Sequence, residues 1–290
     1  MDTSPCPTPL PSHAPDLGAR ALAALCERDP ARKCAAVHAL WAERQVARRQ
    51  APASALRAQC PWPLPGRPER PELIDPSGVP QRSPFTPLGR AALAHAVAHI
   101  EFNAINLALD AIWRFDDLPE AYYQDWLRVA HEEARHFGLM QTELARHGKT
   151  YGDFEAHDGL WQMCERTAHD LTARMALVPR TLEARGLDAT PLIQARLRKV
   201  NTDDAHALVA ALEVILQEEV AHVAIGDRWY RWCCAREGLA PEPHFLALIE
   251  RYRAPRPRPP LNLSARRDAG FGEAELAFLN QSDALWPRTA

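Results

Sequence analysis

The sequence lacks a strong charge bias, a long apolar run and several common site motifs, and each absence argues against a class of protein. The formal net charge is −3 over 290 residues, which gives no overall attraction to nucleic acid or to anionic lipid. No uninterrupted apolar run approaches the length of a membrane span, so we expect no membrane association. There is no Gly-rich phosphate loop, and no Cys-x-x-Cys electron-transfer module.

The N-terminus and the cysteines point to one compartment. Residues 1–5 have no basic region and are not followed by an apolar stretch, so we expect no export signal. The seven cysteines are odd in number and have no regular spacing, which suits a reducing environment better than a disulfide framework. We therefore expect a cytoplasmic protein.

Proline is concentrated in residues 5–14, 52–88 and 241–260, whereas residues 89–238 contain only Pro119, Pro179 and Pro191. Because proline interrupts helices, the long proline-poor interval is predicted to be helical. We predict an all-α protein in three parts. Residues 1–85 form a helical hairpin (16–27 and 30–48) and a proline-rich wrapping arm, 86–238 form a four-helix bundle, and 239–290 form a C-terminal arm with short helices.

Apolar periodicity and end signals predict four long helices over residues 86–115, 119–147, 158–185 and 202–237. Thr86 followed by Pro87 is typical of a helix start. Gly148, Gly186 and Gly238 stand where the last three helices are predicted to end.

Two Glu-x-x-His motifs are the most informative feature of the chain: Glu133 with His136, and Glu219 with His222. A spacing of three places both side chains on one helix face, so that a carboxylate and an imidazole can bind one metal ion. One such motif is weak evidence, but both lie in the middle of a helix and on its apolar stripe. Two such pairs, each with a lone glutamate from another helix, form the ligand set of a dimetal four-helix bundle.

The lone glutamates are predicted from their place in the helices. Glu101 lies in the apolar stripe of the helix over 86–115. The third helix offers Glu165 and Glu183, which are 183 − 165 = 18 residues or five turns apart, so helical phase does not choose between them. Glu183 lies 219 − 183 = 36 residues before Glu219, close to the 133 − 101 = 32 residues of the first pair, so we choose Glu183. Pro179, one turn earlier, indicates either a kink at a ligand or an ordinary surface bend.

Four carboxylates and two imidazoles without a thiolate favour iron, with manganese or a mixed Mn/Fe pair as the next choice. The predicted metal ligands are Glu101, Glu133, His136, Glu183, Glu219 and His222. The alternative without metal is a set of buried Glu–His ion pairs. Burying a carboxylate costs on the order of several kcal/mol, and four would be buried here. Two divalent cations would balance the charge of the four carboxylates.

Other polar residues near these motifs are predicted to have lesser roles. Glu132 and Glu218 each precede a predicted ligand and point about 100° away around the helix, so they should lie beside the ligands or on the surface. His157 is expected to be a loop hydrogen-bonding or capping residue. The arginine-rich segment 251–267 could contact phosphate, but a solvated, extended arm that forms salt bridges to an acidic bundle is the favoured interpretation.

Several segments together resemble a bacterial ferritin-like family of unknown function (domain of unknown function 455), over about residues 80–275. These segments are His99–Glu101, His131–Phe137, Tyr151–Asp153, Ala156–Trp161, Glu183–Asp188, Glu218–His222, Pro259–Asn262, Ala265–Arg266 and Ala269–Phe271. The family is in turn distantly similar to a non-haem di-iron tRNA hydroxylase. The resemblance implies a ferritin-like bundle that uses the same six ligands.

The functional expectation is a dimetal oxygenase that uses dioxygen and an external electron donor on a small-molecule or tRNA substrate. Two alternatives stay open: an iron-handling protein that oxidises ferrous iron without an organic substrate, and a non-enzymatic scaffold whose metals only stabilise the fold. The sequence does not choose a substrate or an oligomeric state.

Overall fold

The computed structural model describes residues 16–58, 63–255 and 257–280, and these residues form helices joined by turns and loops. In this described part there is no β-strand, only two isolated β-bridges. The predicted all-α bundle fold is therefore confirmed.

The chain divides into two compact units. One comprises the described residues up to Arg67 together with Ala108–His131, and the other comprises Pro68–Leu107 together with the described residues from Glu132 onward. All six predicted metal ligands belong to the second unit. The three-part division predicted from the sequence, with boundaries after residues 85 and 238, differs from these two units and stays a prediction.

The first unit contains the predicted helical hairpin, formed by α1 (Leu17–Cys26) and α2 (Pro30–Ala42), followed by α3 (Ala53–Ala58). Asp16 and Asp29 cap the two hairpin helices by accepting hydrogen bonds from backbone N–H groups in the first turn. The prediction that the second helix extends to residue 48 was wrong. The chain leaves the helix after Ala42 into a turn in which the Val46 N–H bonds to the Glu43 carbonyl at 3.0 Å.

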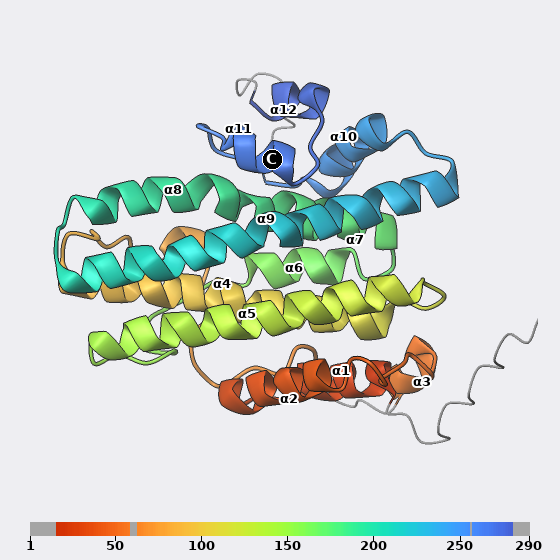
Figure 1. Ribbon diagram of the computed structural model, residues 1–290, viewed down its shortest axis with the longest axis horizontal. Helices are drawn as coiled ribbons and strands as arrows, with labels where there is room; N and C mark the ends of the chain where they lie inside the picture. The colour runs from red at the N-terminus through yellow and green to blue at the C-terminus, as the bar shows by residue number, and fades with distance from the viewer. Residues whose placement is uncertain (1–15, 59–62, 256, 281–290) are drawn as a thin grey trace, which may run out of the picture. The chain divides into compact units, whose positions relative to one another are not determined.

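Three of the four long helices lie where the periodicity places them: α4 (Pro87–Arg114), α5 (Glu120–Arg146) and α9 (Asp203–Glu237). The Thr86 hydroxyl accepts a hydrogen bond from the Gly89 N–H at 3.0 Å and caps α4. Gly238 ends α9 with a φ of 69°, a left-handed conformation that glycine adopts without steric cost. In Figure 1, α5 and α9 appear as two of the long rods of the structure.

The third predicted helix, over 158–185, was wrong in continuity and in length. The chain forms α6 (Gly159–Arg166), α7 (Leu171–Leu177), a π-helical segment η2 (Val178–Glu183) and α8 (Ala184–Arg198). The break before α7 has a local cause, because Asp170 accepts a hydrogen bond from the Ala173 N–H at 2.8 Å and starts a new helix.

Gly186 does not end this helix, and Pro191 does not break it. A proline at position 191 has no N–H to donate to the carbonyl of Leu187, four residues earlier. The Leu187 carbonyl instead accepts a hydrogen bond from the Asn262 side-chain amide at 3.2 Å, so it keeps a hydrogen-bond partner.

The π-helical segment packs closely on α9. A Cβ added at Gly226 of α9 would lie 2.6 Å from two carbons of the Pro179 ring, so only glycine allows this approach. The Thr181 hydroxyl donates to the Ala176 carbonyl at 2.7 Å within the same irregular turn. Pro179 is buried, so the interpretation of this proline as an ordinary surface bend was wrong.

The proline-rich segment of the second unit includes a short 3-10 turn, η1 (Pro76–Gly78). It is held by backbone hydrogen bonds of 2.9 Å from Ile74 N–H to the Ala156 carbonyl and from Ala156 N–H to the Glu72 carbonyl. Residues 72–74 of the proline-rich segment are thus anchored to the loop before α6.

The C-terminal arm carries α10 (Pro241–Tyr252), α11 (Leu263–Asp268) and α12 (Glu273–Leu279).

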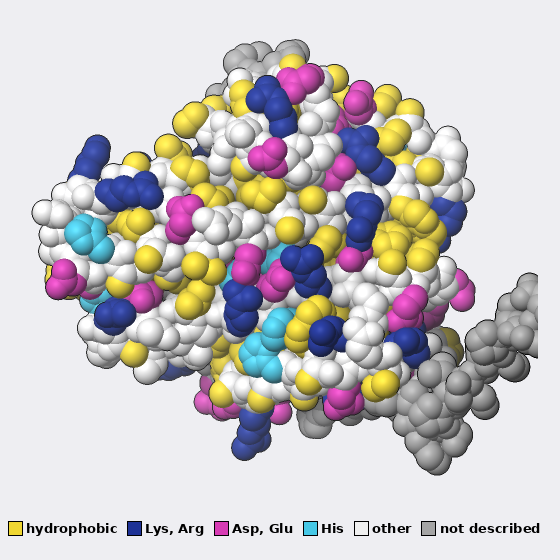
Figure 2. All heavy atoms as spheres, in the orientation of Figure 1, with side chains coloured by type: hydrophobic (Ala, Val, Ile, Leu, Met, Phe, Trp, Pro, Cys, Tyr) yellow, Lys and Arg dark blue, Asp and Glu magenta, His cyan; other side chains and the backbone are white. Residues whose placement is uncertain are grey.

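On the face drawn in Figure 2, basic and acidic side chains are interspersed, in keeping with the small net charge. Among the described residues, no helix is long and apolar enough to cross a bilayer.

The contact between Gly226 and Pro179 generates a stability prediction. We expect Gly226→Ala to lower the free energy of unfolding by about 1–3 kcal/mol, because the new methyl group meets a rigid ring. Gly138→Ala in α5 is the matched control, since a Cβ there meets nothing within 4 Å, and it should be neutral or stabilising by up to about 1 kcal/mol. Urea denaturation of both variants measures the difference; equal stabilities would contradict the packing described.

Candidate metal centre

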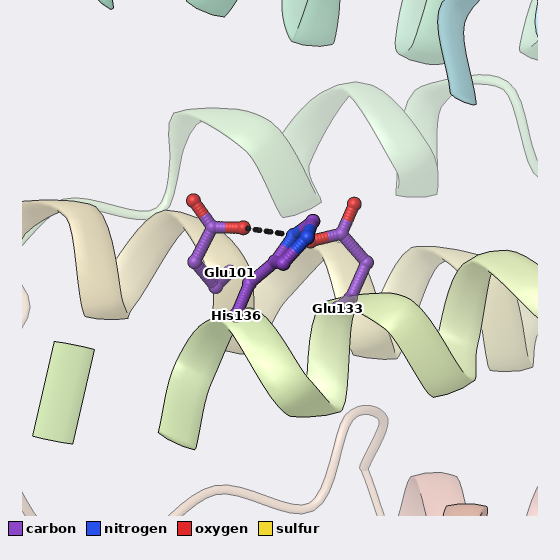
Figure 3. A group of neighbouring side chains, drawn as sticks. All are labelled: Glu101, Glu133 and His136. Carbon is purple, nitrogen blue, oxygen red and sulfur yellow. Dashed lines mark hydrogen bonds and ion pairs between the residues drawn. The ribbon is translucent and has the colours of Figure 1, made fainter. Parts of the chain in front are cut away.

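The second unit brings five of the six predicted ligands together. Glu101, Glu133 and His136 form one group of side chains whose ligand atoms lie within 4.8 Å of one another, and Glu133, Glu219 and His222 form a second. Figure 3 shows the first group, in which Glu101 from α4 and the Glu133–His136 pair from α5 point toward one another. Glu133 belongs to both groups and therefore lies at the centre of the cluster.

Helical spacing accounts for this convergence. In each Glu-x-x-His motif the two side chains lie one turn apart on the buried face of their helix. Glu133 is 1% exposed, and both imidazoles are fully buried. These polar side chains lie at positions where an apolar residue would otherwise complete the core.

Both imidazoles present Nδ1 to the carboxylates. His136 Nδ1 lies 3.2 Å from Glu133 Oε2 and 3.4 Å from Glu101 Oε2. His222 Nδ1 lies 2.8 Å from Glu133 Oε1 and 3.2 Å from Glu219 Oε2. The two oxygens of Glu133 thus face different histidines, an arrangement suited to a carboxylate that bridges two metal ions.

The opposite nitrogen of each imidazole is held by a carboxylate from the other helix. His136 on α5 has its Nε2 2.8 Å from Glu218 Oε2 on α9, and His222 on α9 has its Nε2 2.8 Å from Glu132 Oε2 on α5. A carboxylate only accepts a hydrogen bond, so each Nε2 would keep its proton when metal binds, and Nδ1 is the nitrogen from which a metal would displace a proton. The sequence prediction that Glu132 and Glu218 lie beside the ligands agrees with these contacts. Their reciprocal pairing across helices was missed, although both glutamates stand directly before a predicted ligand.

Glu183 lies at the end of the π-helical segment, buried, but outside the two groups of three. Its Oε2 atom has no hydrogen-bond partner among the described residues. Three residues further on, a Cβ at Gly186 would lie 3.9 Å from Glu219 Cγ, so this stretch of chain packs against the cluster. Glu165, the alternative on α6, is exposed. Of the two candidates, only Glu183 is buried beside the other carboxylates.

Burial and mutual repulsion dominate the electrostatics of the cluster. Burial together with the charge of Glu133 raises the pKa of Glu101 and of Glu219, and burial together with the charge of Glu219 raises the pKa of Glu183. Burial would also raise the pKa of Glu133, but the neighbouring His222 and His136 outweigh it and lower the pKa. Without metal, the cluster therefore reduces its negative charge by holding protons.

The imidazoles hold protons for the same reason. Burial alone would lower the pKa of His136, but hydrogen bonds and charges from Glu101 and Glu133 outweigh it and raise the pKa to about 11. For His222, the effect of burial is outweighed by the Glu133 charge and by the Glu132 hydrogen bond, which raise its pKa well above the usual value.

The donor set fits a metal centre. It combines four buried carboxylates and two imidazoles oriented by Nε2 hydrogen bonds, and one carboxylate oxygen, on Glu183, has no hydrogen-bond partner in the described part of the chain. Two divalent cations would balance four carboxylates and replace the bound protons. The assignment of the six residues as ligands stays a prediction.

Other predicted residues lie outside the cluster. His157 is exposed, and its Nδ1 accepts a hydrogen bond from the Gly159 N–H at 3.3 Å, as expected for a loop capping residue. His99 is buried, and its Nδ1 bonds to the Tyr151 hydroxyl at 2.8 Å. The Tyr151 ring contacts Phe102 and Phe137, the residues that follow Glu101 and His136 in the chain, and the sequence did not place this aromatic group.

The arginine-rich segment is not a uniformly solvated arm. Arg266 pairs at 2.6 Å with Asp188 on α8, as a salt bridge from the arm to the bundle requires, but it is buried, so the expected solvated position was wrong for this residue. Arg267 is exposed as expected, but its partner at 2.6 Å is Glu273 of the arm itself and not an acidic group of the bundle.

An all-α bundle with buried Glu–His groups that could hold metal defines the class of protein. The chain belongs to the family described as "Protein of unknown function (DUF455)", whose model matches residues 26–277. It is 49% identical over 219 residues to an uncharacterised protein of Haemophilus influenzae, covering 73% of this chain and 75% of that protein. No solved structure matches the chain significantly. The likeness to the tRNA hydroxylase family stays a prediction.

The raised pKa of His136 makes metal uptake proton-linked. Because that pKa is about 11, the metal-free imidazole is protonated at neutral pH, and a metal at Nδ1 must displace the proton. We expect Mn²⁺ binding to release protons and to tighten as pH rises from about 6 to 8, since proton competition then falls. Calorimetric titration in two buffers of different ionisation enthalpy measures the release. Heats that do not depend on the buffer, with an affinity that does not depend on pH, would contradict it.

Proposed function

We propose that this protein is a non-haem dimetal carboxylate protein, with iron as the metal, that activates dioxygen as an oxidoreductase. The observation that carries the proposal is the position of Glu133, whose two oxygens face the two histidines of the two Glu-x-x-His motifs. The ligands would be Glu101, Glu133, His136, Glu183, Glu219 and His222. Carboxylate and imidazole donors without thiolate support iron or manganese over copper.

When iron is bound, the site would supply electrons to dioxygen, and the residues of this chain would orient the ligands and exclude water. Glu218 and Glu132 hold the Nε2 atoms of His136 and His222, which fixes both rings with Nδ1 toward the carboxylates. Burial of the ligands keeps bulk water away and strengthens each electrostatic interaction. An oxygenase of this type needs an external electron donor, in keeping with the lack of a Cys-x-x-Cys module.

The ligand assignment predicts a definite metal content. Anaerobic titration with Fe²⁺ should give two ions bound per chain, and Glu133→Ala should lose both, because Glu133 is shared by the two groups. His136→Ala should lose at least the ion beside Glu101. Glu165→Gln, a change at an exposed residue of α6, is the matched control and should keep both ions. Unchanged metal content in Glu133→Ala and His136→Ala, measured by elemental analysis, would show that the assignment is wrong.

Oxygen uptake by the same samples separates an oxygenase from an iron-handling protein. An oxygenase should consume oxygen once for each filling of the site and then need reductant, whereas a storage protein would continue to consume oxygen with added Fe²⁺ and accumulate ferric iron. A loaded protein that does not react with oxygen would support a structural role for the metals.

A further inference from the structure

The C-terminal arm reaches the segment that carries Glu183 through two buried ion pairs. Arg180, three residues before Glu183, is fully buried. Its Nε lies 2.6 Å from Asp227 Oδ1 on α9, and its Nη2 lies 2.5 Å from Glu275 Oε1 on α12. Asp188, five residues after Glu183, pairs at 2.6 Å with the buried Arg266 of α11. Glu183 therefore lies between two points at which the arm holds the chain.

The ion-pair cluster of Arg180, Asp227 and Glu275 is buried and lies among aromatic rings. The Arg180 guanidinium carbon lies 4.3 Å from the centre of the Phe245 ring and 4.4 Å from that of Phe271, both contributed by the C-terminal arm. Arg231 contacts both carboxylates of the pair, Asp227 at 2.8 Å and Glu275 at 3.3 Å. Two arginines and two carboxylates thus balance in charge, and the bonds that hold Arg180 are directional.

The backbone of the arm is shaped for this contact. Gly270 has a φ of 98°, and a Cβ there would lie 2.5 Å from Asp227 Oδ2, so a side chain would displace the carboxylate. The Gly270 carbonyl accepts a hydrogen bond from Arg231 Nη2 at 3.2 Å. The arm therefore approaches α9 closely at the residue that binds Arg180.

The second pair holds the other end of the segment. Arg266 binds Asp188 through both Nε, at 3.0 Å, and Nη2, at 2.6 Å, and its Nη2 also donates to the Ala184 carbonyl at 3.3 Å. Ala184 directly follows Glu183 in the chain. The Asn262 N–H donates to Asp188 Oδ1 at 2.9 Å, so two groups of the arm hold this carboxylate.

Glu183 needs such support more than the other predicted ligands do. The other five lie on α4, α5 and α9, which are continuous α-helices, whereas Glu183 ends a π-helical segment that begins beside Pro179. π-Helical turns are less regular than α-helical turns and frequently occur at functional sites. One oxygen of the Glu183 carboxylate has no described hydrogen-bond partner that could orient it.

We propose that Arg180, held by Asp227 and Glu275, and Asp188, held by Arg266, are positioning residues that fix the π-helical segment so that Glu183 can bind metal. The C-terminal arm is then part of the metal-binding apparatus. This inference rests on the proposed dimetal function, and it assigns the arm to one of the two metal positions, the one completed by Glu183.

The test compares two glutamates of the same short helix in the full-length protein. Glu275→Gln removes the charge that holds Arg180, while Glu273→Gln, the control, removes only an exposed partner of Arg267. Arg180→Met removes the pair from its other side. Each metal-free protein is titrated with Mn²⁺ under anaerobic conditions, and the free ion is counted by electron paramagnetic resonance. Circular dichroism and thermal melting establish that each variant is folded.

We expect the unmodified protein and Glu273→Gln to bind two ions alike. Glu275→Gln and Arg180→Met should bind the first ion normally and the second about tenfold or more weakly, the usual effect of losing a group that orients a ligand. If Arg180→Met does not fold, Glu275→Gln decides, because it keeps the Arg180–Asp227 bond.

Three results would overturn the inference while the proposed function stands. The folded variants Glu275→Gln and Arg180→Met could bind the second ion as tightly as the unmodified protein does, or they could bind both ions equally more weakly. The control Glu273→Gln could also lose as much second-ion affinity as Glu275→Gln does. If the unmodified protein binds no Mn²⁺ and no Fe²⁺, the proposed function fails and this inference fails with it. The isotherm of the unmodified protein distinguishes that case from the other three.

Discussion

The repulsion among buried carboxylates around Glu133 is the constraint on which the rest of this structure depends. Glu133 is 1% exposed and shares its two oxygens between the histidines of two helices. Carboxylates brought this close out of water destabilise a fold unless cations or protons offset their charge. In the metal-free chain, protons on neighbouring groups provide the balance, as the raised pKa values of Glu101 and His136 indicate. A pair of divalent cations would provide it more completely.

The surrounding structure can be understood as a means of keeping this charged centre in order. Glu132 and Glu218 cross between α5 and α9 to hold the outer nitrogens of the two imidazoles. Gly226 of α9 allows the Pro179 ring of the π-helical segment η2 to approach that helix. The arm then adds its buried arginine–carboxylate pairs on either side of Glu183. Rigid α-helices present most of the predicted ligands, and contacts from distant parts of the chain support the remaining one.

The sequence predicted those features that depend on local spacing. The three-residue interval placed His136 beside Glu133, and apolar periodicity gave α4, α5 and α9 nearly to their ends. The prediction of one continuous helix over residues 158–185 failed, because a cap at Asp170 and a π-helical turn leave the apolar pattern almost unchanged. The contact between Arg180 and Glu275 joins residues 95 positions apart, and no local pattern reveals such a pair.

The most direct test of the central claim is anomalous X-ray diffraction from crystals of the protein loaded with iron. We expect two anomalous peaks about 3.5–4 Å apart, one on each side of the Glu133 carboxylate and each within bonding distance of one histidine Nδ1. Crystals grown with iron in excess that show no peak at Glu133, with His136 and His222 still in contact with its oxygens, would contradict the claim that this cluster is built for metal.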